Sequence, residues 1–276
     1  MLWQKIIEQN KFALSNGFLH PIPTTSDYIE SFGIKFVIRI SGILDKKYIS
    51  NFNEKKKGTN PFLPYEKELF VDNLTQTHFC LLNKFNVVNH HILIITKAFE
   101  EQESLLNLHD FKALWTCLSQ IEGLAFYNGG KLAGASQKHK HLQLIPMDLS
   151  LIPIDNIVRA TYKRNTITIS PLMPFLHGII HFELDKAEDS ALLLLESYKI
   201  LQKRFPSRAY NLLVTNNWML LVPRSREKVL NISLNSLAFA GCFFVRSQEY
   251  FDKLAQYGPL NLLRDAGYSS EKELLI

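Results

Sequence analysis

Residues 134–143 read GASQKHKHLQ, and this stretch predicts more about the fold and its chemistry than any other ten residues of the chain. Side chains two apart on a β-strand project from the same face, so an extended conformation would align His139, His141 and Gln143 in one polar row. The small residues before the histidines favour a turn whose backbone N–H groups can point at an anion. A turn that can hold phosphate, leading into a strand that presents imidazoles, indicates nucleophilic chemistry at phosphorus.

A His-x-His pair alone is compatible with two simpler interpretations. Neutral imidazole is a common zinc ligand, and two polar residues can also lie on the solvated face of a strand. Here Lys138 and Lys140 alternate with the histidines, so we expect their charges mainly on the opposite face, where they would raise the local potential. A positive potential repels a metal cation and attracts phosphate, which favours catalysis over metal binding.

Further sequence blocks accompany this stretch along the chain. They are NPFLPY at 60–65, LNKFNV at 82–87 before His90 and His91, YNGG at 127–130, and YNLLVT at 210–215 followed by Trp218 and Met219. Together with GASQKHKHLQ they resemble the ATP adenylyltransferases, also called diadenosine tetraphosphate phosphorylases. This family is a branch of the histidine-triad superfamily related to galactose-1-phosphate uridylyltransferase, and the details here are most similar to cyanobacterial-like bacterial members.

The resemblance implies a two-step nucleotidyl transfer. His141 holds the position of the nucleophile: it would attack the α-phosphorus of the dinucleotide, expel ATP and leave adenylyl-His141. Inorganic phosphate would then attack the same phosphorus and leave as ADP. The reverse reaction, or an exchange of ADP with phosphate or sulfate, would use the same intermediate. A neutral imidazole is a competent nucleophile near pH 7, and dividing the displacement into two steps makes each step easier.

The third position of the histidine triad is occupied by Gln143. A glutamine amide can donate hydrogen bonds to nonbridging phosphate oxygens, but it cannot titrate and therefore offers no base that would activate water. The resemblance implies that this glutamine favours transfer over hydrolysis. His139 would lie beside the nucleophile and help to set its orientation and tautomer, without a covalent role.

The resemblance also assigns residues to substrate binding, which are Lys46, Asn83, Lys84, Asn128, Gly134, Ala135, Ser136, Gln137, Asn211, Thr215 and Arg224. Asn128 would bond ribose or phosphate, and residues 134–137 would line the polyphosphate site. Two alternatives stay open: Lys46 and the lysines that follow it suit a solvated loop, and Asn211 and Thr215 suit ordinary strand positions. We expect a divalent cation, Mg²⁺, to accompany the polyphosphate, with no metal ligands from the protein and no tightly bound organic cofactor.

His177 and His181 would share one face of a strand, and with His139 and His141 they could compose a histidine-rich metal site. The apolar residues around them favour a core strand instead. Two alternatives to the phosphorylase therefore stay in view. One is a metal-dependent dinucleotide hydrolase that uses these four histidines, and the other is a noncatalytic dinucleotide sensor.

The apolar periodicity along the chain predicts an α+β protein. We expect helices at 2–14, 108–122 and 185–204 and a helical tail, with strands at 34–40, 77–82, 91–96, 124–127, 139–145, 176–183, 210–215, 218–222 and 242–245. Residues 45–67 suit a long loop and residues 147–175 a connecting excursion. Hairpin-joined strands favour a largely antiparallel sheet flanked by helices. The resemblance implies a histidine-triad-like fold with a C-terminal extension: one catalytic unit over 1–276, divisible into halves near 1–150 and 151–276.

Composition favours a soluble intracellular enzyme. The chain of 276 residues is 46% hydrophobic and carries a formal charge of +5, which suits a small polyanionic substrate. Cys80, Cys117 and Cys242 are scattered like reduced core residues, and no signal peptide, membrane span or nucleic-acid-binding motif is evident. We expect a cytoplasmic enzyme that acts on diadenosine tetraphosphate, phosphate, ATP and ADP, without nucleic-acid or membrane partners. By family resemblance we expect a monomer.

Overall fold

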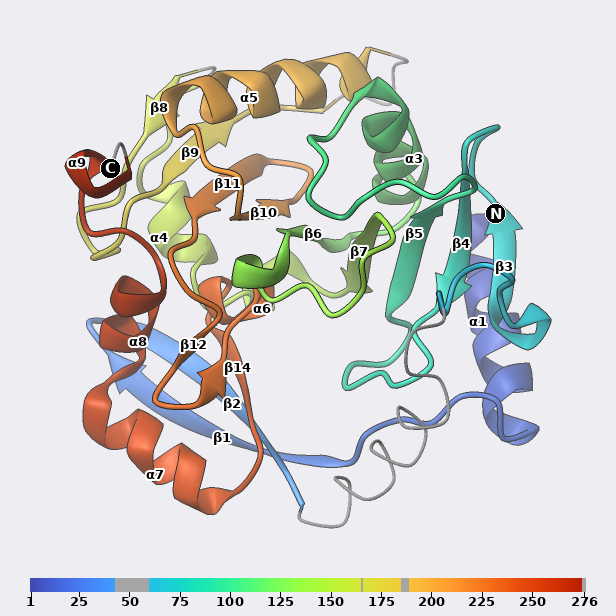
Figure 1. Ribbon diagram of the computed structural model, residues 1–276, viewed down its shortest axis with the longest axis horizontal. Helices are drawn as coiled ribbons and strands as arrows, with labels where there is room; N and C mark the ends of the chain where they lie inside the picture. Colours follow the sequence, from blue (N-terminus) through green and yellow to red (C-terminus); the bar gives the residue numbers. More distant parts are fainter. Residues whose placement is uncertain (43–59, 165, 185–188, 275–276) are drawn as a thin grey trace.

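The computed structural model describes residues 1–42, 60–164, 166–184 and 189–274 of the chain. Its centre is a nine-stranded sheet in the order β3-β4-β5-β7-β6-β10-β11-β9-β8, shown in Figure 1. All neighbouring strands in this sheet pair antiparallel. The strands are β3 (Phe70–Asn73), β4 (His78–Leu82), β5 (Ile92–Thr96), β6 (Gly123–Gly129), β7 (His141–Pro146), β8 (Ile167–Thr168), β9 (Gly178–His181), β10 (Tyr210–Val214) and β11 (Trp218–Pro223). The expected α+β class with a largely antiparallel sheet is confirmed.

One face of the large sheet is covered by α1 (Leu2–Ser15), α3 (Leu108–Leu118) and α5 (Ser190–Arg204) (Figure 1). Their apolar side chains share a core with the strand residues that face them, including Leu142 and Leu144 of β7. A capping box begins α3, in which Asp110 accepts a hydrogen bond from the backbone N–H of Asn107 at 2.7 Å. Packing of the apolar helix faces supplies most of the stability of these helices.

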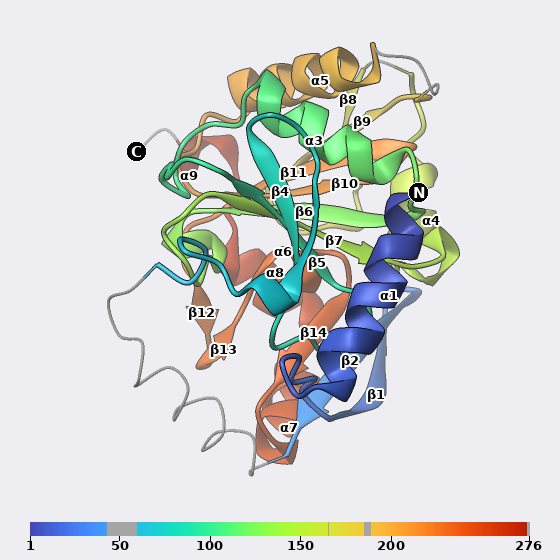
Figure 2. The ribbon, with the colours of Figure 1, turned by 90° about the vertical axis from the view of Figure 1, so that its right-hand side faces the viewer.

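A smaller sheet lies against the opposite face of the large sheet. It consists of β1 (Thr24–Ser31), β2 (Ile34–Ser41) and β14 (Cys242–Val245), and β14 pairs with β2 in parallel. Figure 2 shows this sheet at the bottom of the molecule beside α7 (Gln248–Tyr257); α6 (Ser236–Phe239) and α8 (Pro259–Ala266) belong to the same layer. Phe36, Phe239 and Phe243 pack with Trp218 of the large sheet in a second core. These contacts join the two sheets, and part of the space between the sheets remains open as a cavity.

Short elements join these layers. They are η1 (Lys67–Leu69), η2 (Lys131–Ala133), η3 (Leu149–Leu151), α4 (Asp155–Arg159), the hairpin of β12 (Lys228–Val229) and β13 (Ile232–Ser233), and α9 (Glu271–Leu274). The excursion expected at residues 147–175 thus contains η3, α4 and β8. None of the helices in the described ranges is long and apolar enough to cross a bilayer.

Most of the predicted elements are present, with bounds that differ by a few residues. Helix α3 ends at Leu118 rather than at residue 122, and β6 continues to Gly129. The sequence pattern does not predict β3 or β1. The β1 segment is polar and mostly exposed, and it is extended because it pairs with β2 along its whole length. Of the loop predicted at 45–67, positions 45–59 lie outside the described residues.

Strand β7 divides its side chains between two environments. Leu142 and Leu144 point into the core beneath α3 and α5, whereas His141 and Gln143 face the side of the smaller sheet. The strand begins at His141 rather than at residue 139 as predicted, because His139 lies before it in an isolated bridge with Glu101. The polar row therefore combines two strand residues with one residue from the preceding loop.

Candidate active site

The backbone of His141 is held by a single buried glutamine. The N–H of His141 donates to Oε1 of Gln102 at 2.8 Å, and Nε2 of Gln102 donates to the carbonyl of His141 at 3.2 Å and to that of Asn128 at 2.9 Å. Both His141 and Gln102 are buried. These three bonds fix the first residue of β7 against the neighbouring strand β6, so the position of the imidazole is set by rigid elements.

The tautomer of His141 follows from its hydrogen bond. Nδ1 lies 2.8 Å from the backbone carbonyl oxygen of His139, and a carbonyl can only accept, so Nδ1 carries the proton. Among the described residues, no group forms a hydrogen bond with Nε2. Burial lowers the pKa of His141 to about 4, so the ring is neutral near pH 7. The result is a neutral imidazole whose Nε2 lone pair is available for nucleophilic attack.

The His139 ring anchors a neighbouring segment and does not touch His141. Its Nε2 donates to the carbonyl of Thr96 at 2.9 Å, which leaves Nδ1 to accept from the amide of Asn60 at 2.9 Å. The Phe62 ring then packs against both histidines, with centroid distances of 5.7 Å to His139 and 5.2 Å to His141. The carbonyl of His139 therefore orients the His141 ring. The ring of His139 holds the segment with Asn60 and Phe62, which covers His141.

Gln143 lies two residues beyond His141 on the same face of β7. Its Oε1 accepts a hydrogen bond from Nε2 of His91 at 3.0 Å, and His91 is bonded through Nδ1 to the Asn83 amide at 3.1 Å. Within the described part of the chain, the Nε2 group of Gln143 has no acceptor. Two amide N–H groups beside the nucleophile are thus free to donate to an anion.

The turn at residues 134–137 requires glycine at its first position. Gly134 has φ +88°, and a Cβ there would lie 2.6 Å from the carbonyl oxygen of Leu234. The N–H groups of Gly134 and Ala135 donate to the carbonyls of Lys131 and Gly130, so they are not available to an anion as predicted. The N–H groups of Ser136 and Gln137 donate to no acceptor that the structure describes, and only these two can serve a phosphate.

A buried polar network supports this turn from behind. Oδ1 of Asn128 accepts from the Asn211 amide at 2.9 Å and from the Ser236 hydroxyl at 2.7 Å, and the same Asn211 amide donates to the carbonyl of Ala133 at 2.8 Å. Arg224 donates to Oδ1 of Asn211 and is itself buried. Asn211 and Arg224, which were predicted to contact substrate, are both enclosed and bonded to protein. The Nδ2 group of Asn128 has no acceptor among the described residues.

Three other predicted substrate contacts have different outcomes. The hydroxyl of Thr215 accepts from the N–H groups of Asn217 and Trp218, so Thr215 stabilises the β10–β11 turn and does not reach the site. It lies four residues beyond Asn211, roughly 13 Å along an extended strand. Lys84 forms an ion pair with Glu66 at 2.6 Å, which partly neutralises its charge. Lys46 lies outside the described residues.

Lys140 also differs from its prediction. It does project away from His141, but its ammonium is fully buried, 2.9 Å from Asp110 and 2.9 Å from Glu100. Asp110 also bonds to His78 at 3.1 Å. Although burial raises the pKa of Asp110, the bond from His78 and the charge of Lys140 bring it below its ordinary value, so the carboxylate is ionised. The charge of Lys140 is balanced inside the protein and does not raise the potential at the phosphate site.

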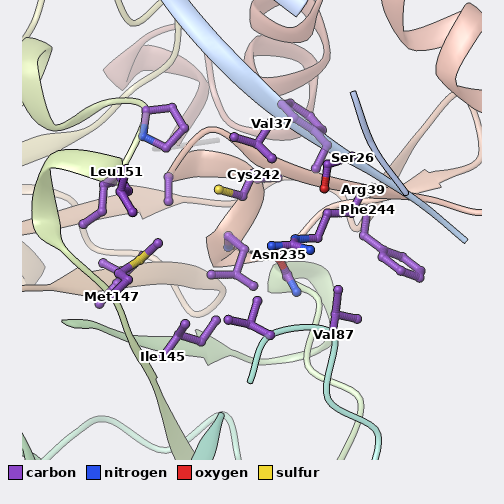
Figure 3. A pocket seen from close by; sticks show the side chains of 18 of the residues that line it. Ser26, Val37, Arg39, Val87, Ile145, Met147, Leu151, Asn235, Cys242 and Phe244 are labelled. Atoms are coloured by element: carbon purple, nitrogen blue, oxygen red, sulfur yellow. Dashed lines mark hydrogen bonds between the residues drawn. The ribbon is translucent and has the colours of Figure 1, made fainter. Parts of the chain in front are cut away.

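A cavity of about 660 Å³ opens between the two sheets beside this cluster (Figure 3). Ile145 and Met147, at the end of β7 and just beyond it, line one wall, and Val37 and Cys242 of the smaller sheet line the opposite wall, as the close-up shows. Mostly apolar walls with a few polar groups are typical of a site that accepts a flat organic ring. The size and lining of the cavity fit a nucleoside.

Two basic residues and several hydrogen-bonding side chains line the cavity. Lys35 and Arg39 line it from β2, and Figure 3 shows Arg39 beside Asn235. No described residue that lines the cavity is acidic. His91, which bonds to Gln143, also lines the cavity, so this lining continues to the polar row on β7. A nucleoside in the cavity could therefore extend its phosphates toward His141 without meeting a carboxylate.

Comparisons with known proteins agree with this geometry. The model of the Ap4A phosphorylase N-terminal domain matches residues 1–160, and that of the ATP adenylyltransferase C-terminal domain matches residues 171–269. The chain belongs to the Ap4A phosphorylase family. It is 28% identical to diadenosine 5′,5‴-P1,P4-tetraphosphate phosphorylase 2 of Saccharomyces cerevisiae, over 92% of this chain and 90% of that protein. It is 25% identical to Protein APA1 of the same organism, over 95% of this chain and 93% of that protein.

Solved structures extend the family likeness to three dimensions. The crystal structure of yeast Ap4A phosphorylase Apa2 in complex with Ap4A matches with a TM-score of 0.84 and 25% identity, covering 97% of both chains. The same enzyme in complex with AMP matches with a TM-score of 0.83 and 26% identity, again over 97% of both chains. The expected histidine-triad-like fold and the identification as a nucleotidyltransferase-type enzyme of the Ap4A phosphorylase family are confirmed.

The four-histidine metal site considered from the sequence does not form in this family member. His177 and His181 flank and end β9, which lies four strand positions from β7, roughly 19 Å away at about 4.8 Å per strand. Both nitrogens of the His177 ring are bonded to backbone groups, of Phe175 and Ser170. In the described ranges, no three His, Cys, Asp or Glu side chains converge as a metal site.

Sequence reasoning missed two residues of the site in this Ap4A phosphorylase family member. Gln102 lies in an irregular segment whose pattern carries no signal, and only the fold shows that it holds the backbone of His141. In the sequence, His91 only follows the block at 82–87, and its neighbours there bear no catalytic groups that would predict a role for it. The pairing of Leu93 with Gln143 across β5 and β7 brings His91 to the site, and that register is a tertiary feature.

Proposed function

We propose that this protein phosphorolyses diadenosine tetraphosphate to ATP and ADP through an adenylyl group on Nε2 of His141. The observation that carries the proposal is the single bond of this ring: Nδ1–H donates to the His139 carbonyl, and Nε2 is left as a buried, neutral nucleophile. Nε2 attacks the α-phosphorus, the bond from phosphorus to the polyphosphate oxygen breaks, and ATP leaves. Inorganic phosphate then attacks the same phosphorus, His141 departs, and ADP is formed.

The hydrogen bond at Nδ1 also supports the intermediate. When Nε2 bonds phosphorus, positive charge develops on the ring, and the Nδ1–H bond to a carbonyl dipole becomes charge-assisted and stronger. The bond exists before the reaction, at 2.8 Å, so no reorganisation is needed to gain this stabilisation. Departure of His141 in the second step restores the neutral ring.

Three sets of donors are placed to bind the phosphate oxygens. They are the amide of Gln143 and the N–H groups of Ser136 and Gln137, none of which has an acceptor among the described residues. Gln143 has no titratable group, so no side chain at this position activates water against the intermediate. This favours phosphate as the acceptor and supports transfer over hydrolysis.

We further propose that the nucleoside occupies the cavity between the sheets and that Lys35 and Arg39 attract the phosphate chain. A divalent cation, Mg²⁺, would arrive with the polyphosphate and screen its charge. The described residues offer no cluster of carboxylates and imidazoles to hold such an ion on their own, so it would be bound mainly by the substrate. One chain supplies every group named here, which supports activity as a monomer.

The proposal is tested by the products formed from ring-labelled diadenosine tetraphosphate. With inorganic phosphate we expect equal amounts of ATP and ADP. Without phosphate we expect only a stoichiometric burst of ATP, because the adenylyl group has no acceptor. Continued formation of ATP and AMP without phosphate would indicate a hydrolase, and tight binding without any ATP would indicate a sensor; either result contradicts the proposal.

A further inference from the structure

The orientation of the Asn83 amide is set by the backbone. Its Oδ1 accepts from the N–H of Phe85 at 3.2 Å, and because a backbone N–H can only donate, this atom must be the oxygen. The other end of the amide is therefore Nδ2, which lies 3.1 Å from Nδ1 of His91. An amide nitrogen only donates, so Nδ1 of His91 is the acceptor and the proton of the neutral ring is on Nε2.

This tautomer determines the orientation of Gln143. Nε2–H of His91 lies 3.0 Å from the side chain of Gln143, and a donor in this place requires the oxygen, Oε1, to face it. The NH₂ group of Gln143 must then point the other way. The hydrogen bonds thus run in one direction, from the Phe85 backbone through Asn83 and His91 to Gln143, and end in N–H groups on the face of β7 that carries His141.

We propose that His91 is a positioning residue, which acts through Gln143 by directing its NH₂ group toward the oxygens of the phosphoryl group on His141. This inference rests on the proposed function. The terminal torsion of a glutamine has two nearly equivalent orientations. Without the bond to His91, the amide can rotate and present its oxygen, whose lone pairs repel the anionic phosphate. His91 removes that orientation before substrate binds.

The surroundings of His91 fit this role. The ring is buried beside Phe126, with centroids 5.8 Å apart, which limits the access of solvent to its two hydrogen bonds. Burial lowers the pKa of His91 to about 4, and the neutral ring is required because a protonated ring would be a donor at both nitrogens. A doubly donating ring could not accept from Asn83, and the directed series of bonds would be broken.

A double-mutant cycle tests whether His91 acts through Gln143. We expect His91→Phe, which keeps a ring of similar shape, to lower kcat about tenfold, as for loss of one buried hydrogen bond, with KM for the dinucleotide changed less than about twofold. We expect Gln143→Ala to lower kcat more strongly, by about 100-fold, because it removes the donors themselves. The double variant should be no slower than Gln143→Ala, since His91 has nothing left to orient.

His177→Phe is the matched control. His177 is also buried with both ring nitrogens hydrogen-bonded, but it lies on a remote strand, so its replacement should cost stability and leave kcat unchanged. His91→Gln, whose amide can donate to Gln143 and accept from Asn83, should recover most of the loss in kcat. Thermal unfolding of each variant identifies any that fail to fold, and His91→Gln then carries the test.

Two outcomes would overturn the inference while leaving the proposed function intact. Wild-type enzyme would still form adenylyl-His141 and release ATP and ADP, but the effects of His91→Phe and Gln143→Ala would multiply fully, or His91→Phe would leave kcat unchanged. Failure of the proposed function looks different, because the wild-type enzyme itself would form no adduct and no ADP.

Discussion

His141 and His177 have almost the same local geometry, yet only one of them is placed to react. Each ring donates from Nδ1 to the carbonyl of the residue two positions before it, at 2.8 Å in both cases. Burial lowers the pKa of each ring to about 4. The difference is at Nε2: in His177 it accepts from the N–H of Ser170 at 2.9 Å, whereas in His141 no described group occupies it.

The comparison separates what makes an imidazole neutral from what makes it a nucleophile. A buried, neutral ring with a fixed tautomer occurs at both positions, so these properties alone do not make an imidazole reactive. Reactivity requires in addition an unoccupied Nε2 and donors around it that bind phosphate. Gln143, Ser136 and Gln137 supply such donors beside His141, so the environment of Nε2 distinguishes the two residues.

The largest expected effect comes from removing Nε2 from each ring in turn. His141→Asn keeps a donor to the His139 carbonyl and loses the nucleophile, so we expect kcat to fall by at least about 10⁴-fold with dinucleotide affinity retained. His177→Asn makes the same chemical change and should leave kcat within about twofold. Steady-state kinetics and calorimetric binding measure both. Comparable losses in the two variants would show that shared geometry, and not the free Nε2, determines activity.

The next largest effect is a loss of stability and comes from Lys140, whose side chain points away from His141 toward Asp110. Lys140→Met leaves Asp110 buried without its cation, and we expect a loss of about 3 kcal/mol in the free energy of unfolding. Because Lys140 does not reach the phosphate site, kcat of the folded enzyme should stay within about threefold. Lys138→Met, at an exposed neighbouring position, should change stability by less than about 0.5 kcal/mol.

Urea denaturation measures these differences in unfolding free energy. If Lys140→Met were as stable as wild type, the buried ion pair would be of no consequence. If its kcat fell as far as that of His141→Asn, the conclusion that Lys140 serves stability and not catalysis would be wrong.

Measured per pH unit, the smallest effect is the dependence of stability on pH. For both histidines the pKa in the folded chain is about 4, below the ordinary 6.5, so between these values the unfolded chain binds more protons. Stability therefore falls as the pH is lowered from 6.5 toward 4, by up to about 1.4 kcal/mol per pH unit for each ring. His177→Asn should make this slope shallower by about one proton, and so should His141→Asn.

The pH dependence of kcat should report on His141 alone, whereas the pH dependence of stability reports on both rings. In wild type and in His177→Asn, kcat should stay nearly constant between pH 7 and 5, because His141 is still neutral there. Urea titrations and initial rates at half-unit intervals measure both quantities. A kcat that halves near pH 6.5 would show that the His141 pKa is not lowered by burial.

The parts of this molecule that were predictable are those with local signals. The alternation in residues 139–145 identified the catalytic strand to within two residues, and the apolar periodicity located α1, α3 and α5. What could not be read from the sequence depends on distant partners. Asp110, which balances Lys140, lies 30 residues away, and its effect on the potential at the site follows only from the packing of α3.

The candidate site also combines residues that have local sequence signals with residues that depend on distant partners. His141 and Gln143 are placed by strand period, whereas His91 and Gln102 arrive through β-sheet register and an irregular segment. The family resemblance assigned Asn211, Thr215 and Arg224 to substrate binding, but all three are buried and bonded to other groups of the protein. Membership of a resembling sequence block therefore does not determine which of its side chains are open to a ligand.

The most direct test of the central claim is to isolate the covalent intermediate and locate its bond. The enzyme is mixed with diadenosine tetraphosphate without phosphate and digested at neutral pH, and the peptides are analysed by mass spectrometry and by ³¹P–¹⁵N NMR on ¹⁵N-histidine-labelled protein. We predict one adenylyl group on the peptide that contains His141, attached through Nε2. Attachment through Nδ1, attachment to His139, or ATP release with no adduct on His141 would contradict the account.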